Sequence, residues 1–172
     1  MKIIFLDIDG CLIPFGNSYE RWKIRDLFQK AEIDWEMVVL PKIDKQCADN
    51  LWRIIEETGA RLVISSSWRH RWSHLQKMLQ SSENGSWDNL WNHVNWKTPS
   101  MTGWWRWNEI LQYLSDYHKT CKEWWHITHW IAIDDDDAWM SRIRDLNNFV
   151  QTRSHIWIDE DSARLAIWLL NI

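Results

Sequence analysis

The sequence predicts an α/β domain: a Rossmann-like parallel β-sheet with helices on both faces. Three observations lead to this fold class. Short apolar runs alternate along the chain with segments whose apolar residues recur at helical spacing. Two of these runs stop abruptly at acidic residues. The chain has 172 residues, of which 45% are hydrophobic, so a single domain of this size can bury its own core.

The predicted elements follow one another in a regular order. Lys2 to Leu6 form an apolar run that ends at acidic residues and Gly10, which is typical of a buried strand leading into a loop. Residues 11–44 lack clear periodicity, and we expect a short flap within one domain spanning residues 1–172, with no large cap domain. The remaining predicted elements are a helix at 45–58 stopped by Gly59, a strand at 61–65, a helix at 68–79, a polar loop at 81–86, a helix at 108–117, a strand at 130–133, a further strand at 148–151 and a final helix from Asp159.

Composition narrows the function classes. With 20 Lys and Arg against 24 Asp and Glu, the formal net charge of −4 disfavours binding to duplex DNA or to an anionic membrane. The three cysteines are widely spaced and form no CxxC pair, which disfavours a disulfide framework and a thiolate zinc site. No segment approaches the length of a membrane span. We therefore expect a soluble, cytoplasmic protein.

Acidic residues follow two of the predicted buried strands. Asp7 and Asp9 follow the first strand, Asp134 and Asp135 follow a later one, and Ser65 ends a third. In open α/β sheets, ligands bind beyond the carboxyl ends of the strands, so these side chains should converge. Carboxylates gathered in this way need a cation, and hard oxygen ligands suit Mg²⁺.

These residues carry a resemblance to a known family. Residues 5–12, FLDIDGCL, resemble the DxDGxL nucleophile motif of the haloacid dehalogenase (HAD) superfamily, whose members are mainly Mg²⁺-dependent phosphohydrolases. Residues 63–69, VISSSWR, resemble the second motif of a small subgroup that contains SSSWR, and residues 131–135, IAIDD, resemble the acidic metal motif. The three motifs occur in the family's order over nearly the whole chain.

The resemblance implies a role for each motif residue. Asp7 would attack phosphorus to form an aspartyl-phosphate, Asp9 would act as general acid and base, and Ser65 would bind the phosphoryl oxygens. Mg²⁺ would lie between the Asp7 carboxylate, the Asp9 backbone carbonyl and Asp134, with Asp135 supporting it or serving as an alternate ligand. A cation is required on chemical grounds as well, because an anionic carboxylate is repelled by an anionic phosphate.

The third motif of the family requires a basic residue. Arg106, before the helix that carries Glu109, is the favoured candidate because a guanidinium can bind two phosphoryl oxygens, and Lys97 is the alternative. The sequence departs from the subgroup at Trp107 and Trp157, where glycine is usual, so we expect these two loops to differ locally.

Substrate contacts are assigned to residues beside the motifs. The candidates for binding substrate are Ser66, Arg69, Trp105 and Trp107. The cluster Trp104, Trp105 and Trp107 brackets Arg106, and the chain has 17 tryptophans in all. This cluster is compatible with core packing, with a homo-oligomer contact, or with stacking on a nucleobase.

The sequence therefore predicts a Mg²⁺-dependent phosphohydrolase that acts on a nucleotide or on a nucleic-acid end through an aspartyl-phosphate. The negative net charge favours mononucleotides over polynucleotides. The alternative is a HAD-fold protein that sequesters a nucleotide with little or no turnover: intact Asp7 and Asp9 favour catalysis, and the two replaced glycines favour remodelling.

Overall fold

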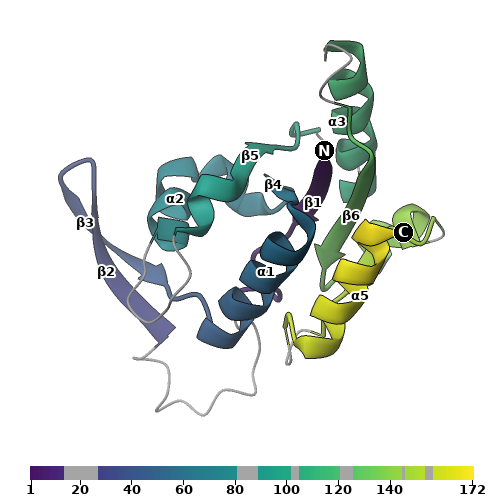
Figure 1. Ribbon diagram of the computed structural model, residues 1–172. Helices are drawn as coiled ribbons and strands as arrows, with labels where there is room; N and C mark the ends of the chain where they lie inside the picture. Colours follow the sequence, from purple (N-terminus) through teal and green to yellow (C-terminus); the bar gives the residue numbers. More distant parts are fainter. Residues whose placement is uncertain (14–26, 81–88, 102–104, 121–125, 145, 154–156) are drawn as a thin grey trace.

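A five-stranded parallel sheet forms the centre of the molecule (Figure 1). The computed structural model describes residues 1–13, 27–80, 89–101, 105–120, 126–144, 146–153 and 157–172. The sheet has the order β5-β4-β1-β6-β7. Its strands are β1 (Lys2–Leu6), β4 (Arg61–Ile64), β5 (Val94–Lys97), β6 (His129–Asp134) and β7 (Phe149–Gln151). The predicted α/β fold class is confirmed.

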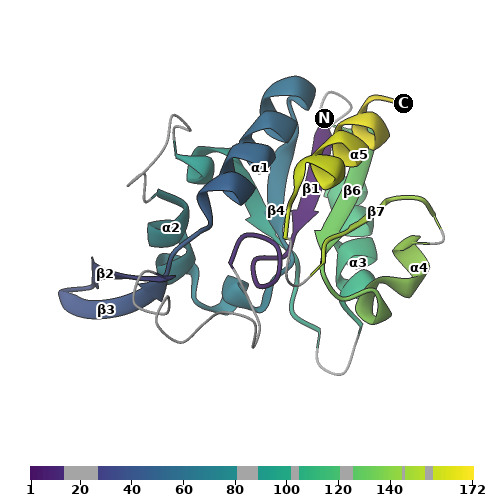
Figure 2. The ribbon, with the colours of Figure 1, turned by 90° about the horizontal axis from the view of Figure 1, so that it is seen from below.

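Helices cover both faces of this sheet. Figure 2 shows α1 and α5 side by side on one face, with α3 on the other. The helices are α1 (Lys45–Thr58), α2 (Trp72–Gln80), α3 (Arg106–Thr120), α4 (Ser141–Arg144) and α5 (Glu160–Asn171). None of the described helices is long and apolar enough to cross a membrane.

The pleat of β1 divides the core into two layers. Ile4 and Leu6 point into a cluster with α1, α2 and α5, whereas Ile3 and Phe5 point into a second cluster with α3. All four side chains have no exposed surface. Because successive residues of a strand face opposite sides, the unbroken apolar run of β1 is what a central strand covered on both faces requires.

The helix boundaries follow from capping residues. The Asp44 side chain accepts a hydrogen bond from the Cys47 N–H at the start of α1, and Gly59 ends that helix at φ +67°. Asp159 caps α5 in the same way as Asp44 caps α1, through the Ser162 N–H. Gly59 and Asp159 lie directly beside the helices that they bound, so the sequence alone predicted where α1 ends and where α5 begins.

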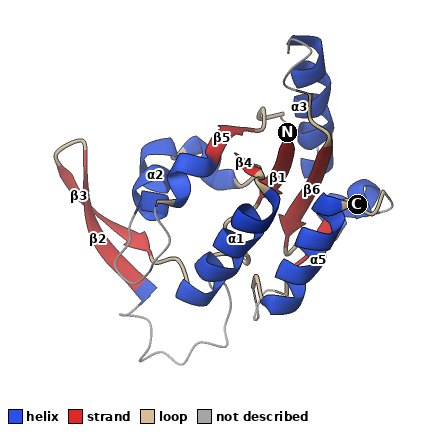
Figure 3. Ribbon diagram, in the orientation of Figure 1, coloured by secondary structure: helices blue, strands red, loops and turns tan. Residues whose placement is uncertain are grey.

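A β-hairpin lies within the expected flap at residues 11–44. It consists of β2 (Phe28–Ile33) and β3 (Glu36–Pro41), joined through Asp34 and Trp35, both with positive φ. Figure 3 shows the hairpin standing apart from the sheet, and Trp35 at its tip is 94% exposed. Residues 14–26 of the flap lie outside the described residues. The single-domain assignment with a flap remains a prediction.

The two positions where tryptophan replaces the expected glycine behave differently. Trp107 lies in the first turn of α3, in ordinary helical structure. Trp157 takes φ +60°, a left-handed conformation that costs a residue with a side chain more than glycine. Position 157 therefore keeps a backbone geometry that glycine adopts easily, with a large side chain packed against the core.

Candidate active site

The strand ends place the polar motif residues side by side. Ladder hydrogen bonds continue one residue past the strands: Asp7 N–H donates to Ile133 O at 3.0 Å, and Ser65 N–H donates to Leu6 O at 3.0 Å. Thr152 N–H donates to Asp134 O at 2.9 Å. Parallel strands have their carboxyl ends at one edge, so this register brings the three motifs together as predicted.

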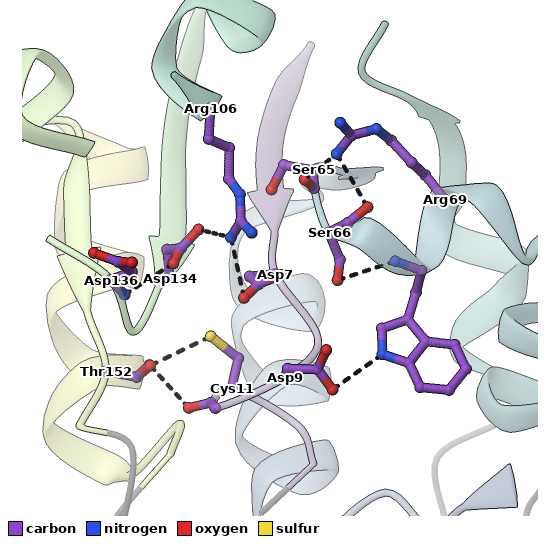
Figure 4. A network of polar contacts seen from close by, with 12 residues as sticks. Asp7, Asp9, Cys11, Ser65, Ser66, Arg69, Arg106, Asp134, Asp136 and Thr152 are labelled. Carbon is purple, nitrogen blue, oxygen red and sulfur yellow. Dashed lines mark hydrogen bonds and ion pairs between the residues drawn. The ribbon is translucent and has the colours of Figure 1, made fainter. Parts of the chain in front are cut away.

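Three carboxylates form a compact cluster at this edge, and Figure 4 shows two of them, Asp7 and Asp134. Asp7, Asp134 and Asp135 each offer an oxygen within 4.8 Å of the others. Asp7 and Asp134 are buried, with 4% and 0% of their surface exposed. The Asp7 Oδ1 atom has no hydrogen-bond partner among the described residues. Buried oxygens of this kind are costly unless a ligand compensates them.

Arg106 extends from the first turn of α3 into this cluster. One nitrogen of its guanidinium, Nη1, lies 3.1 Å from Asp7 Oδ2 and also pairs with Asp134 Oδ2. Although burial alone would lower it, the pKa of Arg106 is raised by Asp7 and Asp134, so the guanidinium stays charged. Arg106 thus links the ends of two strands.

One guanidinium does not balance the cluster. Burial, followed by repulsion from Asp7, raises the pKa of Asp134 to about 7. The same two causes raise the pKa of Asp135. Both shifts come first from burial and then from repulsion, and the charge of Arg106 does not offset them.

The donor set fits Mg²⁺. Three carboxylates at one strand edge, one of them with an unpartnered buried oxygen, provide the hard ligands that this ion prefers. The ion would be held by Asp7, Asp134 and Asp135. The Asp9 carboxylate is not part of this cluster, and the sequence assigned Asp9 to the metal only through its backbone carbonyl.

The Asp9 side chain lies outside the carboxylate cluster and is held by a hydrogen bond from Trp68. The Trp68 Nε1–H donates to Asp9 Oδ1 at 3.0 Å. Burial is the largest cause that raises the pKa of Asp9, and the charge of Asp7 adds to it, against the opposing hydrogen bond from Trp68. A carboxyl group with a raised pKa holds its proton closer to neutral pH, which suits an acid that donates to a leaving group.

The Ser65 side chain has an open hydrogen-bonding capacity. Ser65 is fully buried, and its Oγ has no partner among the described residues. It directly follows β4, as Asp7 directly follows β1, and the last residues of these strands, Leu6 and Ile64, are paired. Ser66 points differently: its Oγ accepts a hydrogen bond from the Trp68 N–H at 3.4 Å and caps the following short 3₁₀ helix, Ser67–His70.

Arg69 is buried in an internal network. Its Nη1 donates to the carbonyls of Ser65 at 2.7 Å and Ser66 at 3.1 Å, and its Nη2 donates to Glu109 Oε1 at 2.7 Å. Glu109 also accepts from the Met101 N–H at 3.0 Å. Glu109 is three residues after Arg106 on α3, so this ion pair ties the loop of Ser65 to the helix of Arg106.

Lys97, the alternative basic residue, lies elsewhere. Its Nζ donates to the Arg69 carbonyl at 3.0 Å and sits 5.1 Å from the centre of the Trp72 ring. Of the two candidates, Arg106 is the one whose contacts reach Asp7 and Asp134.

Trp105 and Trp107, on either side of Arg106, lie in different surroundings. Trp105 is 49% exposed, whereas Trp107 packs beside the second core cluster, with the Arg142 guanidinium 4.8 Å from its ring centre. Trp104 lies outside the described residues. Substrate contacts by Trp105 and Trp107 remain predictions.

Comparison with protein families agrees with this geometry. A family model described as the HAD domain in Swiss Army Knife RNA repair proteins matches residues 3–163. The chain belongs to this HAD family. A search of curated proteins found no match to it.

Sequence reasoning missed two contacts that shape this HAD site. Gly10 has φ +73°, and a Cβ there would lie 2.3 Å from Asp135 Oδ2. Thr152 donates from Oγ1 to the Gly10 carbonyl at 3.1 Å and lies 3.3 Å from the buried Cys11 Sγ. Gly10 was visible as part of the DxDGxL pattern, but nothing near Thr152 in the sequence marks it as a partner of a residue 142 positions away.

Trp68 and Glu109 were also not assigned to the site. Trp68 stands within the SSSWR pattern, and an indole can only donate, so an acidic partner nearby was a signal that could have been used. Glu109 is a charged residue on the buried side of α3, next to Ile110. A buried acid calls for a cation, and Arg69 supplies it.

Proposed function

We propose that this HAD domain is a Mg²⁺-dependent phosphohydrolase that removes a phosphate from a nucleic-acid end or a related nucleotide. The observation that carries the proposal is the Asp7 carboxylate. One oxygen is held by Arg106, and the other is buried without a partner among the described residues, beside Ser65. This is the arrangement that a positioned nucleophile requires.

Asp7 acts as the nucleophile. Its free oxygen forms a bond to phosphorus while the bond from phosphorus to the ester oxygen breaks, giving an aspartyl-phosphate and an alcohol. The Ser65 hydroxyl and the Arg106 guanidinium donate to the phosphoryl oxygens and hold them in line. When bound at the carboxylates, Mg²⁺ supplies positive charge that offsets the repulsion between Asp7 and the phosphate.

Asp9 acts as the general acid and then as the general base. Protonated Asp9 gives its proton to the leaving ester oxygen in the first step. Ionised Asp9 then takes a proton from the water that hydrolyses the aspartyl-phosphate, so that it ends the cycle protonated and Asp7 is released as a carboxylate. The hydrogen bond from Trp68 fixes the Asp9 side chain for both transfers.

The substrate class rests on the family. Its description names RNA repair proteins, which favours a phosphate on a polynucleotide or on a nucleotide derived from one. The polar groups at the carboxyl ends of the strands include the positively charged Arg106, which suits an anionic ester.

The proposed covalent step is tested with Asp9→Asn and an aryl phosphate. An aryl oxide leaves without a proton, so Asp7 still becomes phosphorylated, whereas hydrolysis of the intermediate lacks its base. Intact-protein mass spectrometry after an acid quench should then show the mass of one phosphoryl group on Asp9→Asn. The double variant Asp7→Asn, Asp9→Asn is the control and should show none.

Two results would contradict this function. A phosphoryl group that persists in the double variant would place the nucleophile elsewhere. Recovery of nucleotides and aryl phosphates unchanged from the native protein with Mg²⁺, despite tight binding, would favour the sequestering alternative.

A further inference from the structure

A groove of about 600 Å³ runs along one edge of the sheet, between β5 and the second half of α3. Its walls come from three parts of the chain: β5 with the segment after it, the 3₁₀ helix that follows β4, and α3. The residues that matter here are Trp96, Lys97, Ser100, His70, Tyr113 and Tyr117. None of these side chains belongs to the carboxylate cluster.

The groove adjoins a smaller pocket that reaches Arg106. A smaller pocket of about 250 Å³ is lined by Arg106 and Glu109, and it shares Arg69, His70 and Ser100 with the groove. Arg106 in turn lies 3.1 Å from the proposed nucleophile Asp7. A ligand whose phosphate lies at Asp7 can therefore extend through the smaller pocket into the groove.

The groove extends further than a mononucleotide needs. Arg106 is the first residue of α3, and Tyr113 and Tyr117 follow it by seven and eleven residues. At 1.5 Å of rise per residue, the two rings lie about 10 and 16 Å along the helix from Arg106. Each nucleotide of a stacked strand adds about 3.4 Å along the strand axis. The far end of the groove therefore lies opposite a nucleotide beyond the one that carries the reacting phosphate.

The chemistry of the walls suits bases and a phosphodiester backbone. Trp96 is 59% exposed on the edge strand, and Tyr117, stacked on the buried Tyr113, lines the opposite wall. An exposed aromatic face such as that of Trp96 stacks on any base without reading its sequence. Lys97 and His70 add cationic or hydrogen-bonding groups along the path. Asp116 is an acidic group in the lining.

We propose that this groove is a subsite that binds the nucleotides next to the phosphorylated end of a single-stranded nucleic acid, with Trp96 stacking on a base. The inference rests on the proposed function and makes it more specific: the substrate is an oligonucleotide end. Single-stranded nucleic acid is the fitting form, because its bases are available for stacking. The net charge of −4, which by itself favoured mononucleotides, does not describe this groove, where Lys97 and Trp96 lie with one acidic residue, Asp116.

Binding to Asp7→Asn tests the subsite without turnover. Calorimetry compares a nucleoside monophosphate with trinucleotides of the same terminal base that carry a 5′ or a 3′ phosphate, in the presence of Mg²⁺. We expect at least one trinucleotide to bind about tenfold more tightly than the mononucleotide, which is the range of a single base stacked on an aromatic ring. Adding Trp96→Ala should remove most of that difference.

Trp168→Ala is the matched control. Trp168 is 58% exposed, almost the same as Trp96, but lines a separate groove beside β7. In the Asp7→Asn background it should leave both affinities unchanged. A second variant, Asp116→Asn, should tighten trinucleotide binding about twofold at low salt by removing a negative charge from the groove, a gain that misfolding cannot imitate.

The subsite is overturned if the mononucleotide and both trinucleotides bind equally, or if Trp96→Ala weakens trinucleotide binding no more than Trp168→Ala does. Failure of the proposed function looks different. In that case the native protein hydrolyses neither aryl phosphate nor any nucleotide, whereas the preference for trinucleotides in the binding assay is still measured.

Discussion

The two ends of the same sheet differ in how their polar groups are satisfied. At the amino end, the terminal amine donates to His126 O at 2.7 Å, Thr128 N–H donates to Met1 O at 2.9 Å, and Lys2 Nζ donates to Asn171 at 2.6 Å. At the carboxyl end, Asp7, Ser65 and Arg69 each keep a buried polar atom without a partner, and these are three of four such atoms in the described part of the chain. Asn89, before β5, carries the fourth.

This contrast shows that a site's position in the fold identifies it better than the volume of a cavity does. The groove beside β7, near the amino end, holds about 630 Å³ and is slightly larger than the groove beside β5. It contains Trp130, Leu146, Trp168 and Ile172 and shares no residue with the smaller pocket beside Arg106. Unsatisfied polar groups, which a ligand can satisfy, occur at the other end.

The largest expected effect is that of Asp7→Asn. The amide keeps the shape but cannot attack phosphorus, so phosphatase activity should fall by at least about a thousandfold. Asn171→Ala, which removes the partner of Lys2 at the amino end, should leave activity unchanged. Steady-state assays with an aryl phosphate measure both variants, and thermal melts verify the fold. Equal losses in the two variants would abolish the distinction between the ends.

Removal of divalent metal should have a nearly equal effect on turnover and should also lower the melting temperature. Without Mg²⁺, three carboxylates face one guanidinium, and binding of the ion to the native state stabilises it by about 2.7 kcal/mol at a hundred times its dissociation constant. Melts with EDTA and with Mg²⁺ measure the shift. Asp134→Ala should remove the response to Mg²⁺, and a full response in that variant would exclude Asp134 as a ligand.

The choice between Arg106 and Lys97 predicts an intermediate effect. Arg106→Ala should lower kcat/KM by about a hundredfold or more, because it removes a charged donor that contacts the nucleophile. Lys97→Ala should cost less than about tenfold, since its ammonium donates to a backbone carbonyl. The reverse order would assign the third motif to Lys97.

A prediction about stability rather than turnover separates two ion pairs of similar length. Arg69 and Glu109 pair at 2.7 Å in a buried position, whereas Arg53 and Glu57 pair at 2.8 Å on the surface of α1 near the amino end. Glu109→Ala should cost about 3–5 kcal/mol of unfolding free energy, and Glu57→Ala at most about 1 kcal/mol. Urea denaturation measures both.

Activity measurements test the buried Arg69–Glu109 pair in a second way. In Glu109→Gln, which keeps the shape and one hydrogen bond, kcat should fall with little change in KM if the network aligns Ser65 with Arg106. An unchanged kcat in a destabilised Glu109→Gln variant would show that the pair serves stability alone.

The sequence predicted the elements whose signals are local. β1 and β6 are short apolar runs followed by acids, Gly59 ends α1, and Asp159 caps the start of α5. The convergence of Asp7, Ser65 and Asp134 followed from one topological rule about parallel strands. For these parts, neighbouring residues contain the information.

The parts that could not be predicted depend on distant partners. β5 is a four-residue edge strand, Val-Asn-Trp-Lys, with no apolar pattern of its own, and the hairpin of β2 and β3 mixes charged and apolar residues on each face. Arg69 has the same chemistry whether it binds substrate or Glu109, a residue 40 positions away. Only the folded arrangement shows which cation faces the nucleophile.

Gly10 restricts which substitutions this sequence can accept. Any Cβ at position 10 would occupy the space of the Asp135 carboxylate, so the two positions cannot change independently. A saturation library at position 10 should return only glycine, and a larger residue there requires a smaller one at 135. That exchange would remove one of the three clustered acids. The backbone of the loop after β1 and the charge of the site therefore depend on each other.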